Sequence, residues 1–408
     1  MNSADCWLWV VGIGEDGWDG LNAEARQAIT SATLLYGGAR HLALIPVAAS
    51  DATRIPWPSP MASAMQEILR EHRGRRRITV LASGDPMFYG VGVPLTRGLS
   101  VSEFRVVPQV SALSLACARL GWPVAETSVV SLVNRPVSQL HRQLYAGQRI
   151  IVLSESGDSP SQVATLLAQA GFGSSRLSVF ENLGGPAERC TSGVAAVWPE
   201  EPCGNLNLIA ILCVPDAAVP SLPLLPGLPD GAFETDGQMT KREVRAVTLA
   251  RLAPLPGQLL WDVGAGTGTI AIEWMRVHPS CACIAFERHV DRATRIHRNA
   301  VRLGVPGLKA IEGVAPAAFA GQPAPDAIFI GGGVADDNLF DACWEALASG
   351  GRLVANAVTI ESEARLVSRH AQYGGDLMRM MVSRAEPVGG SYAWRPMMPI
   401  TQWTVTKP

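Results

Sequence analysis

A proline-rich stretch near the middle of the chain, Val214–Gly231, constrains its organisation most strongly. Proline lacks a backbone N–H donor and disfavours a helical conformation in the preceding residue, so neither a helix nor a central strand can run through this stretch. Its prolines are Pro215, Pro220, Pro223, Pro226 and Pro229. We expect a semi-rigid extended linker over residues 215–232, between one domain over residues 1–214 and another over residues 233–408.

Both halves alternate short apolar runs with amphipathic segments, a pattern typical of α/β domains with largely parallel sheets. In the first half, residues 7–14 predict a buried strand, residues 21–37 a helix closed by Gly37, and residues 61–73 a further helix. A chain of 408 residues is long enough for two or three domains. We therefore predict an α/β protein with two domains.

The stretch LLWDVGAGTGTIAIEW, residues 259–274, predicts a strand, a glycine turn and a helix. Glycine in such a turn permits positive φ and lets a ligand approach the backbone without meeting a Cβ atom. Nicotinamide and flavin sites carry the spacing G-x-G-x-x-G, with a pyrophosphate at the helix N-terminus. Here Gly264, Gly266 and Gly268 follow G-x-G-x-G, which favours a ligand without a pyrophosphate, such as S-adenosylmethionine.

The next apolar run supports this interpretation. Residues 281–287, CACIAFE, predict the neighbouring strand, which ends in Glu287, a carboxylate suited to ribose hydroxyls. Asp262, at the end of the first strand, has two interpretations: it orients the glycine turn, or it meets the amino group of the methyl donor. For the glycines alone, the alternative is a tight turn that binds no ligand.

Three further turns in the first half follow predicted strands or precede a predicted helix. Gly84, Asp85 and Pro86 lie at the carboxyl end of a strand, where open α/β sheets bind ligands. Ser111 lies at the start of a helix, where it can cap the helix or contact a ligand. Residues 181–186 form the third turn. An ordinary structural turn is the alternative, so the residues alone leave this site open.

Composition weighs against several classes of function. The formal net charge of −2 gives the chain no overall attraction to nucleic acid. Apolar stretches such as residues 206–214 are far shorter than the roughly 20 residues that span a bilayer. Eight cysteines without a C-x-x-C pair predict reduced core residues and no metal site. The N-terminus has no basic region and predicts a first strand, so we expect a cytoplasmic protein that binds neither nucleic acid nor membrane.

The first half resembles the tetrapyrrole methylase family, whose members methylate ring carbons of cobalamin precursors with S-adenosylmethionine. The motifs VVGIG, GDPMFYG, VPQVSALSLACARLGW and ENLGGPAE follow the family's order between Leu8 and Val214. ENLGGPAE and GIGEDGWDGL are similar to the branch that acts at meso carbon five of a precorrin, although residues 15–17 depart from the Gly-Pro-Gly-Asp of many members. The resemblance implies a fold of two α/β subdomains. It places the methyl donor at Gly84, Asp85, Pro86 and Ser111.

The second half resembles methyltransferases that act at carbon fifteen of a precorrin and remove carbon dioxide from the ring C acetate. The motifs TDGQMTKREVRAVTLARL, FERHVDRATRIHRNAVRLG and PDAIFIGGG are in register with that branch from about Phe233 to the end. The resemblance implies a Rossmann-like class I methyltransferase fold. Its methyl-donor contacts fall on Thr240, Gly264, Ala265, Gly266, Thr267, Gly268, Glu287 and Ala315, of which Thr240 and Ala315 rest on the resemblance alone.

Together the resemblances imply a bifunctional enzyme of aerobic cobalamin biosynthesis that holds two molecules of S-adenosylmethionine and forms a homo-oligomer. It would methylate precorrin-6B at carbons five and fifteen, decarboxylate the ring C acetate and yield precorrin-8X. Methyl transfer from a sulfonium needs alignment of the reacting carbons rather than a metal or a protein nucleophile. No metal cofactor is therefore expected.

The substrate carries several carboxylates, so its pocket should offer cations. Lys241 and Arg242, at a predicted helix start, are candidates to bind one of them; the alternative is a solvated helix face. Glu243 is one candidate proton donor for the decarboxylation, beside His297 and Tyr392.

Two other functions stay open. The chain can be a methyltransferase for another substrate, such as RNA or a protein carboxylate, or one half can bind a tetrapyrrole without catalysis. The stretch Gly331–Gly333 has no side chains to stack on a flat amine and leaves room for a bulky ring, which favours a macrocycle.

Overall fold

The computed structural model describes residues 6–217, 219 and 222–408. Contacts divide them into two compact units. The first unit contains the residues up to Arg135 together with Tyr145–Val219, and the second contains the segment Pro136–Leu144 together with the residues from 222 onward. The segment Pro136–Leu144 thus groups with the second unit although it interrupts the first in sequence. The boundaries at residues 214 and 233 stay a prediction.

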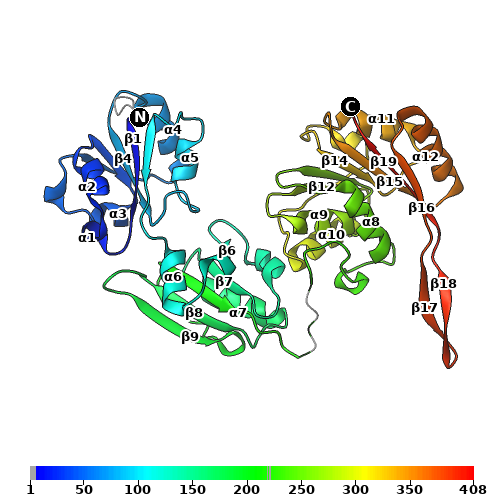
Figure 1. Ribbon diagram of the computed structural model, residues 1–408, viewed down its shortest axis with the longest axis horizontal. Helices are drawn as coiled ribbons and strands as arrows, with labels where there is room; N and C mark the ends of the chain where they lie inside the picture. The colour runs from blue at the N-terminus through cyan, green and yellow to red at the C-terminus, as the bar shows by residue number, and fades with distance from the viewer. Residues whose placement is uncertain (1–5, 218, 220–221) are drawn as a thin grey trace. The chain divides into compact units, whose positions relative to one another are not determined.

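The first unit opens with a five-stranded sheet in which all strands are parallel, in the order β3-β2-β4-β1-β5 (Figure 1). Its strands are β1 Leu8–Ile13, β2 Leu34–Gly37, β3 Thr53–Pro56, β4 Ile78–Ser83 and β5 Phe104–Val107. Its helices are α1 Gly17–Gly20, α2 Ala23–Thr30, α3 Ala39–Ala43, α4 Met61–Glu71 and α5 Gly92–Thr96. Helices α2 and α3 contribute to the core on one face, and α4 and α5 to the core on the other.

The second sheet of the first unit is mixed, with the order β6-β7-β10-β8-β9. Only β6 and β7 run parallel; the other neighbours are antiparallel. Its strands are β6 Thr127–Ser131, β7 Arg149–Leu153, β8 Arg176–Glu181, β9 Arg189–Val194 and β10 Asn207–Leu212, and its helices are α6 Ala112–Leu120 and α7 Ser159–Gln169. The unit therefore has the two α/β subdomains that the sequence predicts.

The second unit is built on a seven-stranded sheet with the order β13-β12-β11-β14-β15-β19-β16. Strands β13 to β15 are mutually parallel, whereas β19 is antiparallel to both of its neighbours. The strands are β11 Leu259–Val263, β12 Ala282–Glu287, β13 Lys309–Glu312, β14 Ala327–Ile330, β15 Arg352–Ala357, β16 Asp376–Met380 and β19 Ile400–Thr406. This is the predicted Rossmann-like arrangement, and the α/β fold class of the whole chain is confirmed.

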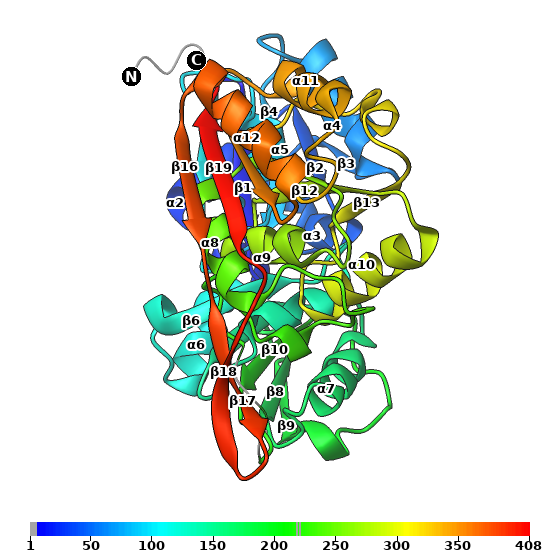
Figure 2. The ribbon, with the colours of Figure 1, turned by 90° about the vertical axis from the view of Figure 1, so that its right-hand side faces the viewer.

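Helices cover both faces of this sheet. Helices α8 Arg242–Leu252, α9 Thr269–Val277 and α10 Val290–Arg302 pack into one core, and α11 Asp337–Ala346 and α12 Ile360–Tyr373 pack into the other. Figure 2 shows α12 lying along β16 and β19. Across the described parts of the chain, no helix has both the length and the apolar character needed to cross a bilayer.

A two-stranded hairpin, which we call the arm, extends beyond the sheet of the second unit (Figure 1). It consists of β17 Ser383–Val388 and β18 Ser391–Pro396, which pair antiparallel with each other. Tyr392 and Trp394 on β18 are 76% and 75% exposed. Arg384 on β17 attaches the base of the arm to Asp230 and to Glu243 of α8.

The predicted helix over residues 21–37 is wrong in its second half. Helix α2 begins after Asn22, whose side chain accepts a hydrogen bond from the Ala25 N–H, and it ends at Thr30. Residues Leu34–Gly37 form strand β2 instead and are buried throughout. Burial of this apolar run between β3 and β4 outweighs its capacity for helix formation, because four consecutive buried residues suit a strand covered on both faces.

Candidate active site

A cavity of about 980 Å³ opens at the carboxyl ends of β11, β12, β14 and β15 in the second unit. This edge of a parallel sheet is the usual ligand-binding edge of doubly wound folds. The volume lies at the upper end of the range for small-molecule pockets. Predicted methyl-donor residues that line the cavity are Thr240, Gly264, Ala265, Gly266, Thr267, Glu287 and Ala315. The fold thus brings seven of these residues from four separate stretches of sequence to one cavity.

The glycine turn between β11 and α9 requires its glycines. Gly264, Gly266 and Gly268 have φ values of 74°, 59° and 76°, in the left-handed region that other residues avoid. A Cβ atom on Gly264 would lie 3.1 Å from the backbone nitrogen of Gly332. Gly268 is outside the cavity lining, where a Cβ atom would lie 3.0 Å from the side chain of Ile296. Gly264 and Gly266 therefore shape the cavity wall, while Gly268 permits close packing of α10 behind it.

Glu287 is fixed at the end of β12 by two backbone donors. One carboxylate oxygen accepts the N–H of Gly266 at 2.8 Å, and the other accepts the N–H of His289 at 3.0 Å. The side chain is buried and lines the cavity. Each oxygen retains a lone pair, so the carboxylate can also accept ribose hydroxyls as the sequence predicts.

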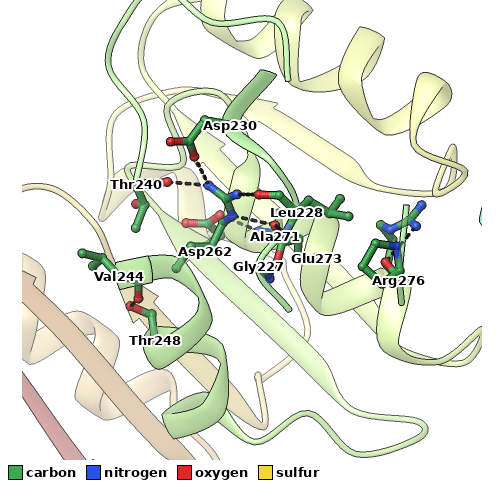
Figure 3. Close-up of polar contacts among 12 residues, drawn as sticks. Gly227, Leu228, Asp230, Thr240, Val244, Thr248, Asp262, Ala271, Glu273 and Arg276 are labelled. Carbon is green, nitrogen blue, oxygen red and sulfur yellow. Dashed lines mark hydrogen bonds and ion pairs between the residues drawn. The ribbon is translucent and has the colours of Figure 1, made fainter. Parts of the chain in front are cut away.

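Asp262 lies at the floor of the same cavity and is 1% exposed. Its Oδ2 accepts the N–H of Ala271 in the first turn of α9 at 3.1 Å (Figure 3). Its Oδ1 is buried and has no hydrogen-bond partner among the described residues. Burial, with a smaller contribution from the Glu287 carboxylate, raises the pKa of Asp262 to about 7. One oxygen thus braces the helix that follows the glycine turn, and the other is free for a ligand, so both interpretations of Asp262 fit its geometry.

The basic residues at the start of α8 have different environments. Lys241 lines the cavity, and among the described residues its ammonium has no hydrogen-bond or ion-pair partner. Arg242 does not line the cavity. Arg245 is completely buried and binds Glu273, Asp230 and the carbonyl oxygens of Thr240 and Leu228 (Figure 3). Lys241 is therefore the cation of this group that is available to a substrate.

The candidate proton donors do not gather in this cavity. Glu243 forms an ion pair with Arg384 at 2.6 Å, and this partner lowers the pKa of the Glu243 carboxyl. Tyr392 lies on the exposed arm, and neither it nor His297 of α10 lines the cavity. An ionised, paired carboxylate is a poor proton donor, so this arrangement does not favour Glu243.

Sequence reasoning missed one wall of the cavity. It is formed by side chains from β15, from the return between the arm and β19, and from the start of α11: Leu339, Asn356, Val358, Met397, Met398 and Ile400. No sequence motif marks these residues, because the segments that carry them come together only when β19 inserts antiparallel beside β15. The wall is mostly apolar, which suits the flat face of a macrocycle.

The first unit has a smaller cavity, of about 90 Å³, between its two sheets. Gly84 lines this cavity and has a φ of 53°. A Cβ atom on Gly84 would lie only 3.1 Å from the Cα of Ser111, which is a tight contact. Asp85, Pro86 and Ser111 lie outside the lining. Asp85 accepts the N–H of Met87, and Ser111 caps α6 by accepting the N–H of Ser114. These bonds fix the two turns whose backbones meet at Gly84.

A polar cluster beside this cavity was not anticipated. Arg40 forms an ion pair with Glu15 and contacts His41 and Ser83 at 2.8 and 3.1 Å. Burial, together with the adjacent Arg40 guanidinium, lowers the pKa of His41 to about 4. The cluster stands at the carboxyl ends of β1, β2 and β4, so it extends the polar surface around Gly84.

Comparison with known proteins gives matches over both halves. Residues 7–196 match the family model described as tetrapyrrole (corrin/porphyrin) methylases, and residues 231–407 match the model described as a precorrin methyltransferase domain. A curated relative from Sinorhizobium sp, precorrin-6Y C(5,15)-methyltransferase [decarboxylating], is 49% identical over 403 residues, which cover 98% of this chain and 96% of the relative. The chain belongs to the family of decarboxylating precorrin-6Y C(5,15)-methyltransferases.

A second curated relative agrees with this membership. A relative of the same name from Mycobacterium tuberculosis is 45% identical over 98% of this chain and 99% of its own. The crystal structure of the C-terminal domain of precorrin-6Y C5,15-methyltransferase from Rhodobacter capsulatus is 44% identical, covering 46% of this chain and 100% of that one, with a TM-score of 0.44. The resemblances of both halves, and the class of S-adenosylmethionine-dependent methyltransferase, are confirmed.

Proposed function

We propose that this chain methylates precorrin-6B at carbons five and fifteen and removes carbon dioxide from the ring C acetate, yielding precorrin-8X in aerobic cobalamin biosynthesis. The first unit acts at carbon five and the second at carbon fifteen. The names of the full-length relatives support the pair of reactions, and the two family models support the division between the halves.

One observation carries the proposal: the large cavity of the second unit joins a methyl-donor wall to an open apolar wall. Gly264, Gly266 and Glu287 form the first wall, and Met397 and Met398 belong to the second. A volume of about 980 Å³ leaves space beside a nucleoside-sized ligand for a large ring. The residues present therefore fit S-adenosylmethionine together with a macrocycle.

When bound, S-adenosylmethionine supplies a methyl group attached to a positively charged sulfur. The leaving group is the neutral thioether. The protein must align the methyl carbon and the ring carbon, at about 3 to 3.5 Å. Glu287 and the glycine turn fix one partner, and the ammonium of Lys241 binds a carboxylate of the other. Val244, Leu339 and Ile400 offer apolar surface to the ring face.

We further propose two methyl-donor sites, one in each unit. The glycine-dependent turns at Gly84 and Gly264 support this count, because each lines a cavity at the carboxyl ends of parallel strands. Calorimetric titration of the whole chain with S-adenosylmethionine should find two equivalents. A single equivalent would favour a non-catalytic binding role for one half.

The activity is tested by incubating the whole chain with precorrin-6B and S-adenosylmethionine and measuring product masses. We expect a gain of two methyl groups and a loss of one carbon dioxide. A Gly264→Val variant should add one methyl group and release no carbon dioxide, whereas Gly84→Val should add one and release it. Unchanged substrate with the wild-type chain would contradict the proposal.

The chain also forms a homo-oligomer through the arm in this proposal. A two-stranded hairpin is marginally stable alone, and its outer edges offer unpaired backbone groups. Tyr392 and Trp394 supply exposed aromatic surface along it. Light scattering of the wild-type chain and of Trp394→Ser tests this, since the variant should shift toward the monomer.

A further inference from the structure

Three polar side chains at the apolar wall of the large cavity form a closed ring of hydrogen bonds. Asn356 Nδ2 donates to Thr248 Oγ1 at 3.0 Å, and Gln402 Nε2 donates to Thr248 Oγ1 at 3.0 Å and to Asn356 Oδ1 at 2.8 Å. Thr248 in turn donates to the carbonyl oxygen of Val244 at 2.8 Å (Figure 3). Thr248 and Gln402 are completely buried, whereas Asn356 is half-buried and lines the cavity.

The ring permits one orientation of the Asn356 amide. Thr248 Oγ1 uses its proton on Val244 and both lone pairs on the two amides, and Gln402 Nε2 uses both of its protons inside the ring. Rotating the Asn356 amide by half a turn would place its NH₂ against the NH₂ of Gln402. It would also place its oxygen against a hydroxyl whose proton is already donated. The NH₂ of Asn356 is therefore held in place before any ligand arrives.

Asn356 keeps hydrogen-bonding capacity that the ring does not use. An amide has two N–H donors and two oxygen lone pairs, and the ring takes one of each. The paired strands β15 and β19, where Asn356 and Gln402 stand opposite each other, do not need this ring for their backbone ladder. Burying the polar side chains of Thr248 and Gln402 is costly compared with apolar packing, so the ring calls for a role beyond the fold.

We propose that Asn356 is a substrate-binding residue whose free N–H holds the carboxylate that leaves as carbon dioxide, with Thr248 and Gln402 as positioning residues. This inference rests on the function proposed above for the cavity. It separates two kinds of carboxylate: Lys241 binds one that stays on the product, and Asn356 binds the one that is lost.

The neutral character of Asn356 is the reason for this assignment. A hydrogen bond from a cation stabilises a carboxylate about twice as strongly as one from a neutral group, and would hold back its departure. A neutral N–H fixes the carboxylate out of the ring plane without that penalty. The bond between the acetate methylene and the carboxylate carbon breaks, its electron pair enters the conjugated ring, and carbon dioxide leaves. The methylene then takes a proton from water and becomes a methyl group.

The test uses the whole chain, precorrin-6B carrying a labelled ring C carboxylate, and S-adenosylmethionine. For Asn356→Leu we expect the release of labelled carbon dioxide to fall about tenfold to a hundredfold. Methyl transfer to carbon five and the dissociation constant of S-adenosylmethionine in the second unit should stay unchanged. For Thr248→Val the same release should fall less, because the amide is retained but no longer oriented.

The isosteric variant Asn356→Asp guards against a folding defect. Its carboxylate repels the substrate carboxylate, so release of carbon dioxide should fall at neutral pH and recover as pH falls and the new side chain is protonated. Wild-type release by Asn356→Leu, or loss of methyl-donor affinity in step with release, would overturn the proposal. A wild-type chain that neither methylates nor decarboxylates the substrate would instead refute the proposed function itself.

Discussion

The Arg245 guanidinium and the Glu273 carboxylate form an ion pair at 2.5 Å in which the side chains are 0% and 2% exposed. Glu273 also accepts the N–H groups of Gly227 and Leu228, at the end of the proline-rich linker. Arg245 holds the carbonyl oxygen of Thr240, which borders the cavity. The pair thus fastens the linker end and the segment before α8 to the helix that follows the glycine turn.

Arg245→Leu leaves the Glu273 carboxylate buried without its cation. Breaking a buried pair in this way costs about 3–5 kcal/mol. We expect calorimetry to show an unfolding transition of the second unit at markedly lower temperature. The control is Arg251→Leu, which removes an exposed pair with Asp376 and should change the stability by less than about 1 kcal/mol. Equal effects of the two substitutions would contradict the role of burial.

Gly264→Ala tests the close approach within the large cavity. An alanine at this position must adopt a positive φ, which costs about 1–2 kcal/mol. Its Cβ atom would lie 3.1 Å from the backbone nitrogen of Gly332. The affinity for S-adenosylmethionine in the second unit should fall at least about tenfold by calorimetric titration. Gly257→Ala is a matched control, because its φ is 86° and nothing lies within 4 Å of the new Cβ. It should lower stability and spare binding.

Gly84→Ala applies the same reasoning to the first unit. Its Cβ would lie 3.1 Å from the Cα of Ser111 and 3.2 Å from the carbonyl oxygen of Val110. We expect the stoichiometry of S-adenosylmethionine binding to fall from two to one and methylation at carbon five to stop. Gly98→Ala, with a φ of 87° and open space around its Cβ, should keep both sites. Two full sites in the Gly84 variant would argue against a methyl-donor site there.

We expect methyl-donor binding in the second unit to depend on pH through Asp262. Its pKa is raised from 3.8 to about 7, so a bound ammonium group nearby favours the ionised form and expels a proton near neutrality. Affinity should therefore increase as pH rises, by up to about tenfold per unit below pH 7, and level off above it. Titrations in buffers with different ionisation enthalpies measure the released proton. Asp262→Asn should abolish the proton release; if it persists, another group is responsible.

The same raised pKa has an effect on stability. Between pH 3.8 and about 7 the folded chain holds a proton on Asp262 that the unfolded chain has lost. The stability that this group contributes is complete below pH 3.8 and declines as pH rises toward 7. Asp262→Asn should flatten this part of the stability profile of the ligand-free chain, measured by denaturant unfolding.

Lys241→Ala should raise the KM for the tetrapyrrole about tenfold or more without changing methyl-donor affinity, because a charge-assisted hydrogen bond to a carboxylate is lost. Arg242→Ala is the neighbouring control, since Arg242 is outside the cavity lining. Steady-state kinetics of carbon dioxide release measure the KM for the tetrapyrrole in both variants. Similar KM changes in the two variants would indicate a general effect of positive charge at this helix start.

The cavity wall formed by the glycine turn and Glu287 was predictable from sequence because its parts are local. A strand, a glycine turn and a helix are consecutive in residues 259–274, and Glu287 ends the next strand along the chain. The opposite wall was not predictable, because Asn356 and Met398 meet only after β19 has returned antiparallel beside β15. The cluster of Arg40 and His41 escaped notice for a related reason: the misassigned helix over residues 21–37 concealed the strand whose end carries it.

The arm is joined to the cavity by a short loop. Strand β18 ends at Pro396 and β19 begins at Ile400, and Met397 and Met398 between them line the cavity. A force on the arm therefore reaches the rim of the cavity through very little intervening chain. If identical copies associate through their arms, this association also affects access of the macrocycle to the cavity. The quaternary structure would then influence the rate of turnover.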